Sequence, residues 1–193
     1  HLINILLIGQ DRREGQTDQR SDAMILCSLN RDNNTLTMTS FMRDMFLEIP
    51  GHGEQRINKA YEWGGHELLE QTISYHFDIQ IDHSIEVDFF AFQKIIDQLG
   101  GVEIELTKKE ADYLNRRGNW DVEPETAGTW SLTEGVNLLN GSQALAYSRI
   151  RDIGDDFQRT ARQRTVLNVL FDRAKNQNFL EMYQMLNTLM PLV

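Results

Sequence analysis

Five arginines lie within sixteen residues of the chain, between Arg149 and Arg164. The cluster stands out because the formal net charge of the 193-residue chain is −10 at pH 7. A guanidinium group is planar, stays charged, and can donate two parallel hydrogen bonds to a phosphate or carboxylate group. These residue types at this spacing therefore predict a site for a strongly anionic group. The five are Arg149, Arg151, Arg159, Arg162 and Arg164.

Residues 156–175 are predicted to form a helix that carries part of this cluster. At about 100° per residue, one face of this helix is basic in its first turns and apolar further along. A face that packs inward must supply its arginines with an anion, because an unpaired buried charge costs on the order of several kcal/mol. The residues on this face are Arg159, Arg162, Gln163, Val166 and Leu170. Arg164 is expected to point the other way, into solvent.

Two questions about the cluster stay open on sequence alone. Arg149 and Arg151 project together only if the chain around Ile150 is extended, and diverge by about 200° if it is helical. The helix arginines could also pair with carboxylates close in sequence instead of binding a ligand. Those carboxylates are Asp152, Asp155 and Asp156.

Two further carboxylates flank one loop near the N-terminus. Asp11 follows the first predicted strand, and Asp22 opens the second. Two carboxylates without a neighbouring His or Cys suit a hard cation such as Mg²⁺, with Mn²⁺ as the alternative. The competing interpretation is that both aspartates cap turns. Arg43 and Asp44 follow the third predicted strand and fit either a functional site or a surface ion pair.

Apolar patterning predicts the elements that position these residues. A continuous apolar run at residues 2–8 is typical of a central strand, and the polar segment 31–34 predicts a turn between two antiparallel strands. The expected strands are residues 2–8, 22–29, 35–41, 84–87 and 102–106. The expected helices are residues 66–77, 89–99, 142–147, 156–175 and 178–190, and residues 108–139 are expected to be a long excursion of loop and short helix. Strands mixed with helices predict an α/β fold, a single-domain α-β-α layered sandwich around a central mixed β-sheet.

Composition excludes several classes of protein. A sequence pI near 4.9 argues against a nucleic-acid surface, so no nucleic-acid partner is expected. The single cysteine, Cys27, cannot form an intramolecular disulfide, a zinc cluster or a dithiol redox site. No stretch approaches the roughly 20 apolar residues that cross a bilayer. Serine-hydrolase, Walker and dinucleotide-binding motifs do not occur.

Eight motifs occur in an order that resembles the LytR-CpsA-Psr family of bacterial cell-wall enzymes. The resemblance covers nearly the whole chain. Each motif is modest alone, and their common order carries the resemblance. One departure is Arg56, where the family usually has Lys, and this keeps the charge. The motifs are residues 4–11 (NILLIGQD), 20–22 (RSD), 41–44 (FMRD), 56–61 (RINKAY) with Gly64 and Gly65, 87–89 (VDF), 99–102 (LGGV), 139–151 (LNGSQALAYSRIR) and 156–163 (DFQRTARQ).

The resemblance implies a catalytic domain over residues 1–193 and a phosphotransferase. Such an enzyme moves a glycopolymer of teichoic acid or capsular polysaccharide type from a polyprenyl pyrophosphate carrier to peptidoglycan. The resemblance also implies a location at the extracellular face of the bacterial cytoplasmic membrane. Family members are usually anchored there by an N-terminal membrane helix, which residues 1–193 are not expected to contain.

The resemblance also implies roles for individual residues. Asp11 and Asp22 would hold Mg²⁺, and Arg43 would lie nearest the reacting phosphate. The predicted catalytic residues are Arg43, Asp11 and Asp22. The predicted pyrophosphate-binding residues are Arg20, Arg43, Arg149, Arg151, Arg159, Arg162 and Gln163.

Two other functions fit the same residues. One is a pyrophosphatase that acts on lipid or nucleotide diphosphates with water as acceptor. The other is a polyprenyl-phosphate-binding module without catalysis.

Overall fold

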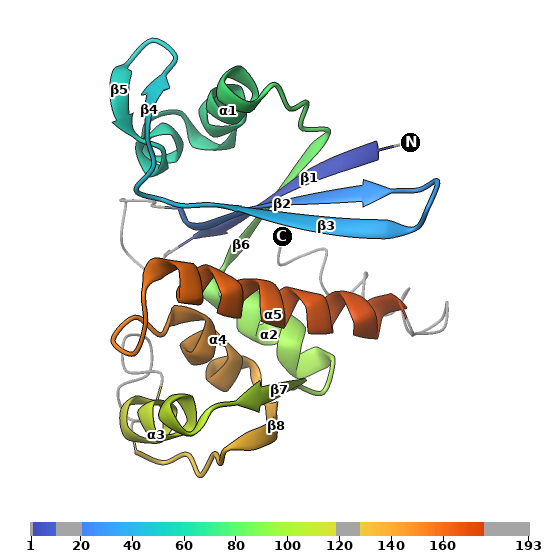
Figure 1. Cartoon of the computed structure of the whole chain (residues 1–193), viewed down its shortest axis with the longest axis vertical. Helices are drawn as coiled ribbons and strands as arrows, with labels where there is room; N and C mark the ends of the chain where they lie inside the picture. The colour runs from blue at the N-terminus through green and yellow to red at the C-terminus, as the bar shows by residue number, and fades with distance from the viewer. Residues whose placement is uncertain (1, 11–20, 119–127, 176–193) are drawn as a thin grey trace. The chain divides into compact units, whose positions relative to one another are not determined.

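A computed structural model describes residues 2–10, 21–118 and 128–175 of the chain (Figure 1). The chain divides into two compact units, the first ending at Phe89 and the second beginning at Phe90. The extent of a single domain over residues 1–193 stays a prediction. Both units mix strands with helices, so the predicted α/β class is confirmed.

The first unit is built on a four-stranded mixed sheet in the order β3-β2-β1-β6. Strand β1 lies inside the sheet, antiparallel to β2 and parallel to β6, as Figure 1 shows. The central position predicted for the first strand and the mixed character of the sheet are both confirmed. The strands are β1 (Leu2–Gln10), β2 (Ser21–Asn30), β3 (Thr35–Phe41) and β6 (His83–Asp88).

The apolar run of β1 explains its place in this sheet. Alternate side chains of a strand point to opposite faces, and Leu6 and Ile8 are fully buried in the core of the first unit. The strand ends beside β2, where Gln10 is paired with Ser21 after an irregularity in the register. This pairing matters for the site because Asp11 and Asp22 are the next residues in the sequence.

Helix α1 (Asn58–Phe77) packs against β2 and against a small hairpin of β4 (Phe46–Ile49) and β5 (Gly53–Arg56). The helix is broken at Gly64 and Gly65, and Gly65 has φ +63°, a conformation that glycine adopts without steric cost. The break divides α1 into two helical segments, and only the second corresponds to the predicted helix at 66–77.

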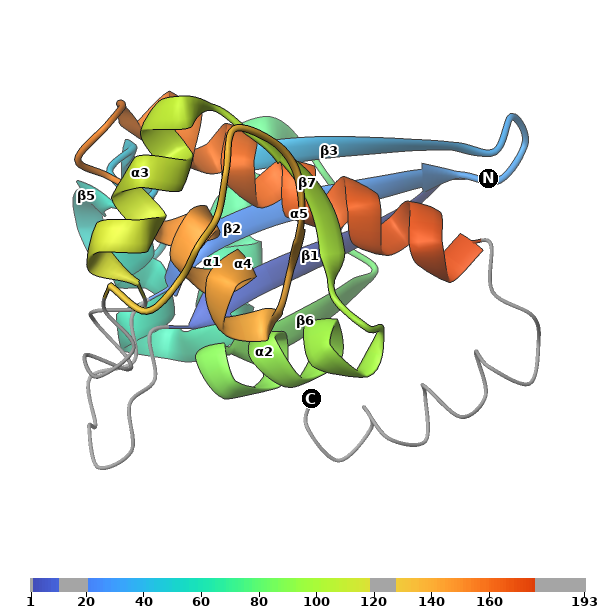
Figure 2. The same cartoon turned by 90° about the horizontal axis from the view of Figure 1, so that it is seen from below.

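The described part of the second unit combines a two-stranded ribbon with four helices (Figure 2). Figure 2 shows α4 among its neighbours, and it contacts α3, α5 and β8. Twelve of the buried residues described in this unit form an apolar cluster that includes Ile104, Leu114 and Val166. The elements are α2 (Phe89–Gln98), β7 (Val102–Leu106), α3 (Lys108–Arg117), β8 (Gly135–Leu139), α4 (Gly141–Arg149) and α5 (Asp156–Lys175).

The five predicted strands are confirmed to within two residues at each end, and α5 has the predicted bounds. Three strands are absent from the prediction: the two of the β4–β5 hairpin, and β8, which pairs with β7 inside the region expected to be an excursion. The helix predicted at residues 178–190 lies outside the described residues.

Candidate anion-binding site

The segment that carries Arg149 and Arg151 is neither a continuing helix nor a strand. Arg149 is the last residue of α4, and the next residue, Ile150, has an extended backbone with φ −55° and ψ 124°. Ile150 is buried, Arg149 is half-buried and Arg151 is exposed. The chain therefore changes direction between the two arginines.

Helix α5 has the mixed face that the spacing predicts. Arg159 is 4% exposed and Arg162 is 7% exposed, and Val166 on the same face is fully buried. Gln163 is half-buried. The expectation for Arg164 is wrong, because this side chain is half-buried and not in open solvent.

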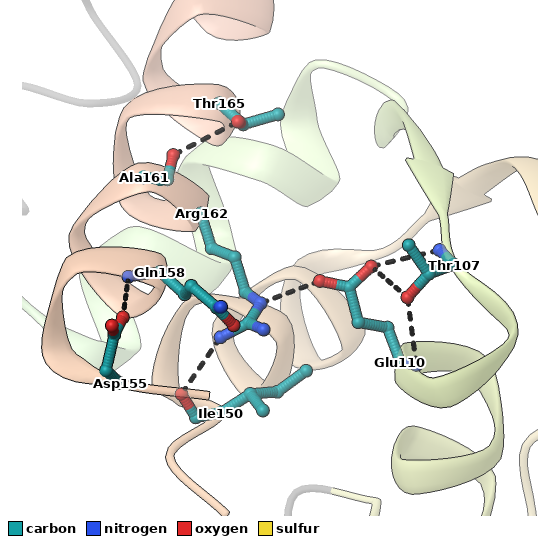
Figure 3. Close-up of polar contacts among 8 residues, drawn as sticks. All are labelled: Thr107, Glu110, Ile150, Asp155, Gln158, Ala161, Arg162 and Thr165. Carbon is teal, nitrogen blue, oxygen red and sulfur yellow. Dashed lines mark hydrogen bonds and ion pairs between the residues drawn. The ribbon is translucent and has the colours of Figure 1, made fainter. Parts of the chain in front are cut away.

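Arg162 is held by two partners inside the second unit (Figure 3). Its Nε donates a hydrogen bond to Oε1 of Glu110 at 2.7 Å, and its Nη1 donates to the carbonyl oxygen of Ile150 at 3.3 Å. Pairing with a carboxylate is the alternative that the sequence left open, but the partner is 52 residues away and is none of the three nearby aspartates.

Glu110 is positioned by the start of its own helix. Thr107 and Glu110 form a capping box, in which Oγ1 of Thr107 accepts from the Glu110 N–H while Oε2 of Glu110 accepts from the Thr107 N–H. Burial by itself would raise the pKa of the Glu110 carboxyl group. The hydrogen bonds from Arg162 and Thr107 outweigh burial and lower this pKa below its usual value. Glu110 is therefore a buried carboxylate ion that faces a buried guanidinium.

The three aspartates near α5 have identifiable roles. Asp155 caps the helix by accepting a hydrogen bond from the Gln158 N–H at 2.8 Å. Asp156 lies 3.9 Å from Nη1 of Arg159, at the limit of an ion pair. Asp152 accepts a hydrogen bond from the Tyr113 hydroxyl at 3.1 Å and lies 3.4 Å from Arg117.

In the first unit, Arg43 belongs to a chain of alternating charges. Its Nε lies 3.5 Å from Oδ2 of Asp44, whose Oδ1 lies 3.4 Å from Nη1 of Arg56. The side chain of Arg43 is 28% exposed and that of Arg56 is 60% exposed. Asp44 thus faces two guanidinium groups, and Arg43 is the less exposed of them.

The predicted metal ligands lie only partly within the described residues. Asp11 and Arg20 fall outside them, as does the side chain of Asp22. The described residues contain no group of three or more His, Cys, Asp or Glu side chains that could hold a metal ion. The paired residues Gln10 and Ser21 directly precede Asp11 and Asp22 in sequence.

A polar network at the same end of β1 is absent from the sequence prediction. The Gln10 amide donates to the Tyr61 hydroxyl and to Oε2 of Glu86, both at 2.5 Å, and Tyr61 donates to the same oxygen at 3.0 Å. His66 lies 3.0 Å from the other oxygen of Glu86. The parallel register of β1 and β6, which pairs Ile8 with Glu86, brings these residues together, and no local motif signals it.

The model of the LytR_cpsA_psr family matches residues 1–193. The chain belongs to this family. The resemblance read from the ordered motifs is therefore confirmed.

Among characterised relatives, the chain is 35% identical over 185 residues to the polyisoprenyl-teichoic acid–peptidoglycan teichoic acid transferase TagT of Bacillus subtilis, a match that covers 94% of the chain and 55% of the relative. It is 34% identical over 171 residues to the regulatory protein MsrR of Staphylococcus aureus, covering 87% of the chain and 48% of the relative. The chain thus spans about half the length of these family members.

Solved structures of the family have the same fold. A structure of TagT bound to LIIa-WTA has a TM-score of 0.79 at 32% identity, over 92% of this chain and 65% of that one. A structure of YwtF (TagT) with bound octaprenyl pyrophosphate lipid has a TM-score of 0.76 at 30% identity, over 99% of this chain and 74% of that one.

Proposed function

We propose that this family member is a phosphotransferase that moves a glycopolymer of teichoic acid type from a polyprenyl pyrophosphate carrier to peptidoglycan. The observation that carries the proposal is the likeness over 99% of the chain to a family structure with bound octaprenyl pyrophosphate lipid. A teichoic acid transferase is also the activity named for a 35% identical relative. Capsular polysaccharide is the second class of cargo that the family resemblance implies.

The arginines supply the charge that such a substrate requires. A pyrophosphate group carries its negative charge on oxygens that paired guanidinium donors fit. In the second unit, the proposed ligands are Arg149 at the end of α4, Arg151 in the segment between α4 and α5, and Arg159 and Gln163 on α5. In the first unit, the proposed ligands are Arg20 and Arg43.

The proposed reaction needs no covalent nucleophile on the protein. A sugar hydroxyl of peptidoglycan attacks the phosphorus next to the glycopolymer, and the bond from that phosphorus to the bridging oxygen breaks. Polyprenyl phosphate leaves with the bond electrons, and the hydroxyl proton passes to a base. The protein contributes position and positive charge, which dominate catalysis of phosphoryl transfer.

Asp11 and Asp22 are the proposed ligands of a divalent cation, Mg²⁺ or Mn²⁺. Two carboxylates and phosphate oxygens are a donor set that Mg²⁺ favours in proteins. When bound, the cation would neutralise charge on the phosphate oxygens. Arg43 is proposed to donate to the reacting phosphate, since its guanidinium is partly exposed and its backbone carbonyl accepts from the Asn58 N–H at the start of α1.

The proposed location is the extracellular face of the bacterial cytoplasmic membrane, where a lipid carrier and peptidoglycan meet. None of the helices in residues 2–10, 21–118 and 128–175 has the length and hydropathy needed to cross a membrane. Attachment through an N-terminal membrane helix is a separate proposal about the whole protein.

The test uses a polyprenyl-pyrophosphate-linked oligosaccharide, peptidoglycan fragments and Mg²⁺, with the conjugate measured by mass spectrometry. We expect a conjugate from the parent protein and about 100-fold less from Arg43→Ala, a loss typical for removal of one donor to a developing charge. Arg31→Ala, in the exposed turn after β2, is the matched control with unchanged yield.

Other outcomes identify the other functions. Release of phosphate without conjugate indicates a pyrophosphatase, and binding of the lipid without either product indicates a binding module. Either result contradicts the proposed transfer.

A further inference from the structure

Arg162 connects three segments of the second unit. It stands on α5, its Nε donates to Glu110 near the start of α3, and its Nη1 donates to the backbone carbonyl of Ile150. Figure 3 shows the guanidinium between the Glu110 carboxylate and the Ile150 carbonyl. The two contacts use different nitrogens of one planar group, so both are made at once.

The hydrogen bond from Arg162 to the Ile150 carbonyl fixes the backbone between two arginines of the proposed site. Ile150 lies between Arg149 and Arg151, and its buried side chain and its carbonyl are both held by the interior of the unit. The residue has left the helix, and its N–H keeps one long hydrogen bond to α4, to the Tyr147 carbonyl at 3.4 Å. The bond from Arg162 therefore limits how the two flanking arginines are oriented, relative to the helix that carries Arg159.

The buried Glu110–Arg162 ion pair is expected to add little to the stability of the fold. The side chains are 11% and 8% exposed. Desolvation of two charges consumes much of the Coulomb gain of a buried ion pair, and replacing such a pair with neutral side chains of similar size is often nearly neutral for stability. Specificity of geometry is a benefit that an uncharged replacement would not supply.

We propose that Glu110 and Arg162 are positioning residues for the pyrophosphate-binding arginines. Glu110 orients the guanidinium of Arg162, and Arg162 holds the backbone between Arg149 and Arg151 in the conformation that binds the anion. Arg162 thereby acts without contacting the ligand, in contrast to the role that its motif implies. This inference rests on the proposed function.

The test separates positioning from stability with a double variant, Glu110→Gln with Arg162→Met. A glutamine in place of Glu110 can still complete the capping box, and a methionine in place of Arg162 fills space without leaving a buried charge unpaired. We expect the melting temperature of the double variant to stay close to that of the parent. The single variant Arg162→Met is expected to melt much lower, because it leaves the Glu110 carboxylate buried without its cation. Arg162→Lys serves as a second probe, since it keeps the charge and cannot make both contacts with one planar group.

Affinity is measured by calorimetry with farnesyl pyrophosphate, a short soluble polyprenyl pyrophosphate, at a temperature where every variant is folded. We expect the double variant and Arg162→Lys to bind about 10-fold more weakly than the parent. Arg164→Met is the matched control on the same helix and is expected to bind normally. In an Arg151→Ala background the double change is expected to cost less, because one of the arginines that it positions is gone.

Three outcomes contradict the inference and are distinguishable. If the folded double variant binds with the affinity of the parent, the positioning role is wrong, and the proposed function is unaffected. An equal loss in the parent and Arg151→Ala backgrounds shows that Arg162 contacts the ligand directly and also overturns it. Absence of binding by the parent protein overturns the proposed function, and this inference with it.

Discussion

Glu86 on β6 and His66 on α1 are in contact, with 3.0 Å between Oε1 and Nδ1. The other oxygen of Glu86 accepts hydrogen bonds from Gln10 and Tyr61, which are 5% and 3% exposed. One carboxylate therefore satisfies the polar groups that close the end of β1, next in sequence to a proposed metal ligand.

Substitution Glu86→Ala is expected to destabilise the protein by about 2–3 kcal/mol. The change leaves the buried Gln10 amide and Tyr61 hydroxyl without this acceptor, and unsatisfied buried groups are costly. Urea denaturation measures the effect, with the exposed Glu67→Ala as control on the same unit. A loss no larger than that of the control would show that the network adds nothing to stability.

Acid stability should depend on Glu110. Its pKa is lowered in the folded protein, so the folded state holds this proton more weakly than the unfolded state. Its contribution to stability is complete above the ordinary glutamate pKa of about 4.3 and disappears as pH falls through the lowered value. Between about pH 5 and pH 3, the parent should therefore lose more stability than Glu110→Gln. Chemical denaturation across this pH range measures the loss of stability. The control is Glu103→Gln, on the exposed side of β7, which should lose as much stability as the parent does.

The thiol of Cys27 should be unreactive in the folded protein. It is 3% exposed, and burial raises its pKa to about 11. Since only the thiolate is alkylated, iodoacetamide at pH 8 should label the folded protein more than about 100-fold more slowly than the urea-unfolded protein. Mass spectrometry follows the reaction, and Cys27→Ala gives the background. Rapid labelling without denaturant would indicate that β2 opens readily.

Gly141→Ala should be destabilising by about 1–3 kcal/mol, because a Cβ at this position would overlap the backbone carbonyl of Gln93 on α2. Gly141 also donates its N–H to Oδ1 of Asp97 at 2.7 Å, so the close approach of α2 and α4 depends on it. Gly154→Ala is the control, since the atoms nearest to a Cβ there belong to the flexible side chain of Gln158. Thermal melts compare the two variants. Equal decreases in melting temperature for Gly141→Ala and Gly154→Ala would contradict the prediction.

Elements with a strong local pattern are predictable from the sequence. The apolar run of β1 and the polar turn before Thr35 give the strands and their antiparallel pairing. The hairpin of β4 and β5 is not predictable in the same way, because its strands have four residues each and include Glu48, Glu54 and Arg56 in place of an apolar run. In β8, Val136 and Leu138 are exposed, so its apolar alternation does not mark a buried face.

The site is predictable in its composition but not in its pairings. Helical spacing places Arg159 and Arg162 on the buried face of α5, and the structure confirms this. Helical spacing cannot reveal that Arg162 is held by Glu110, because contact between residues 52 positions apart depends on how α3 and α5 pack. The available signal is the capping box of Thr107 and Glu110, which marks a helix start and not an ion pair.

Helix α5 turns the same side toward the interior at Arg162 and, one turn later, at Val166. A repacking of the interior that tilts or slides this helix would move its guanidinium groups by a similar amount. A substitution that changes how this helix packs is therefore expected to change the melting temperature and the proposed binding of pyrophosphate together.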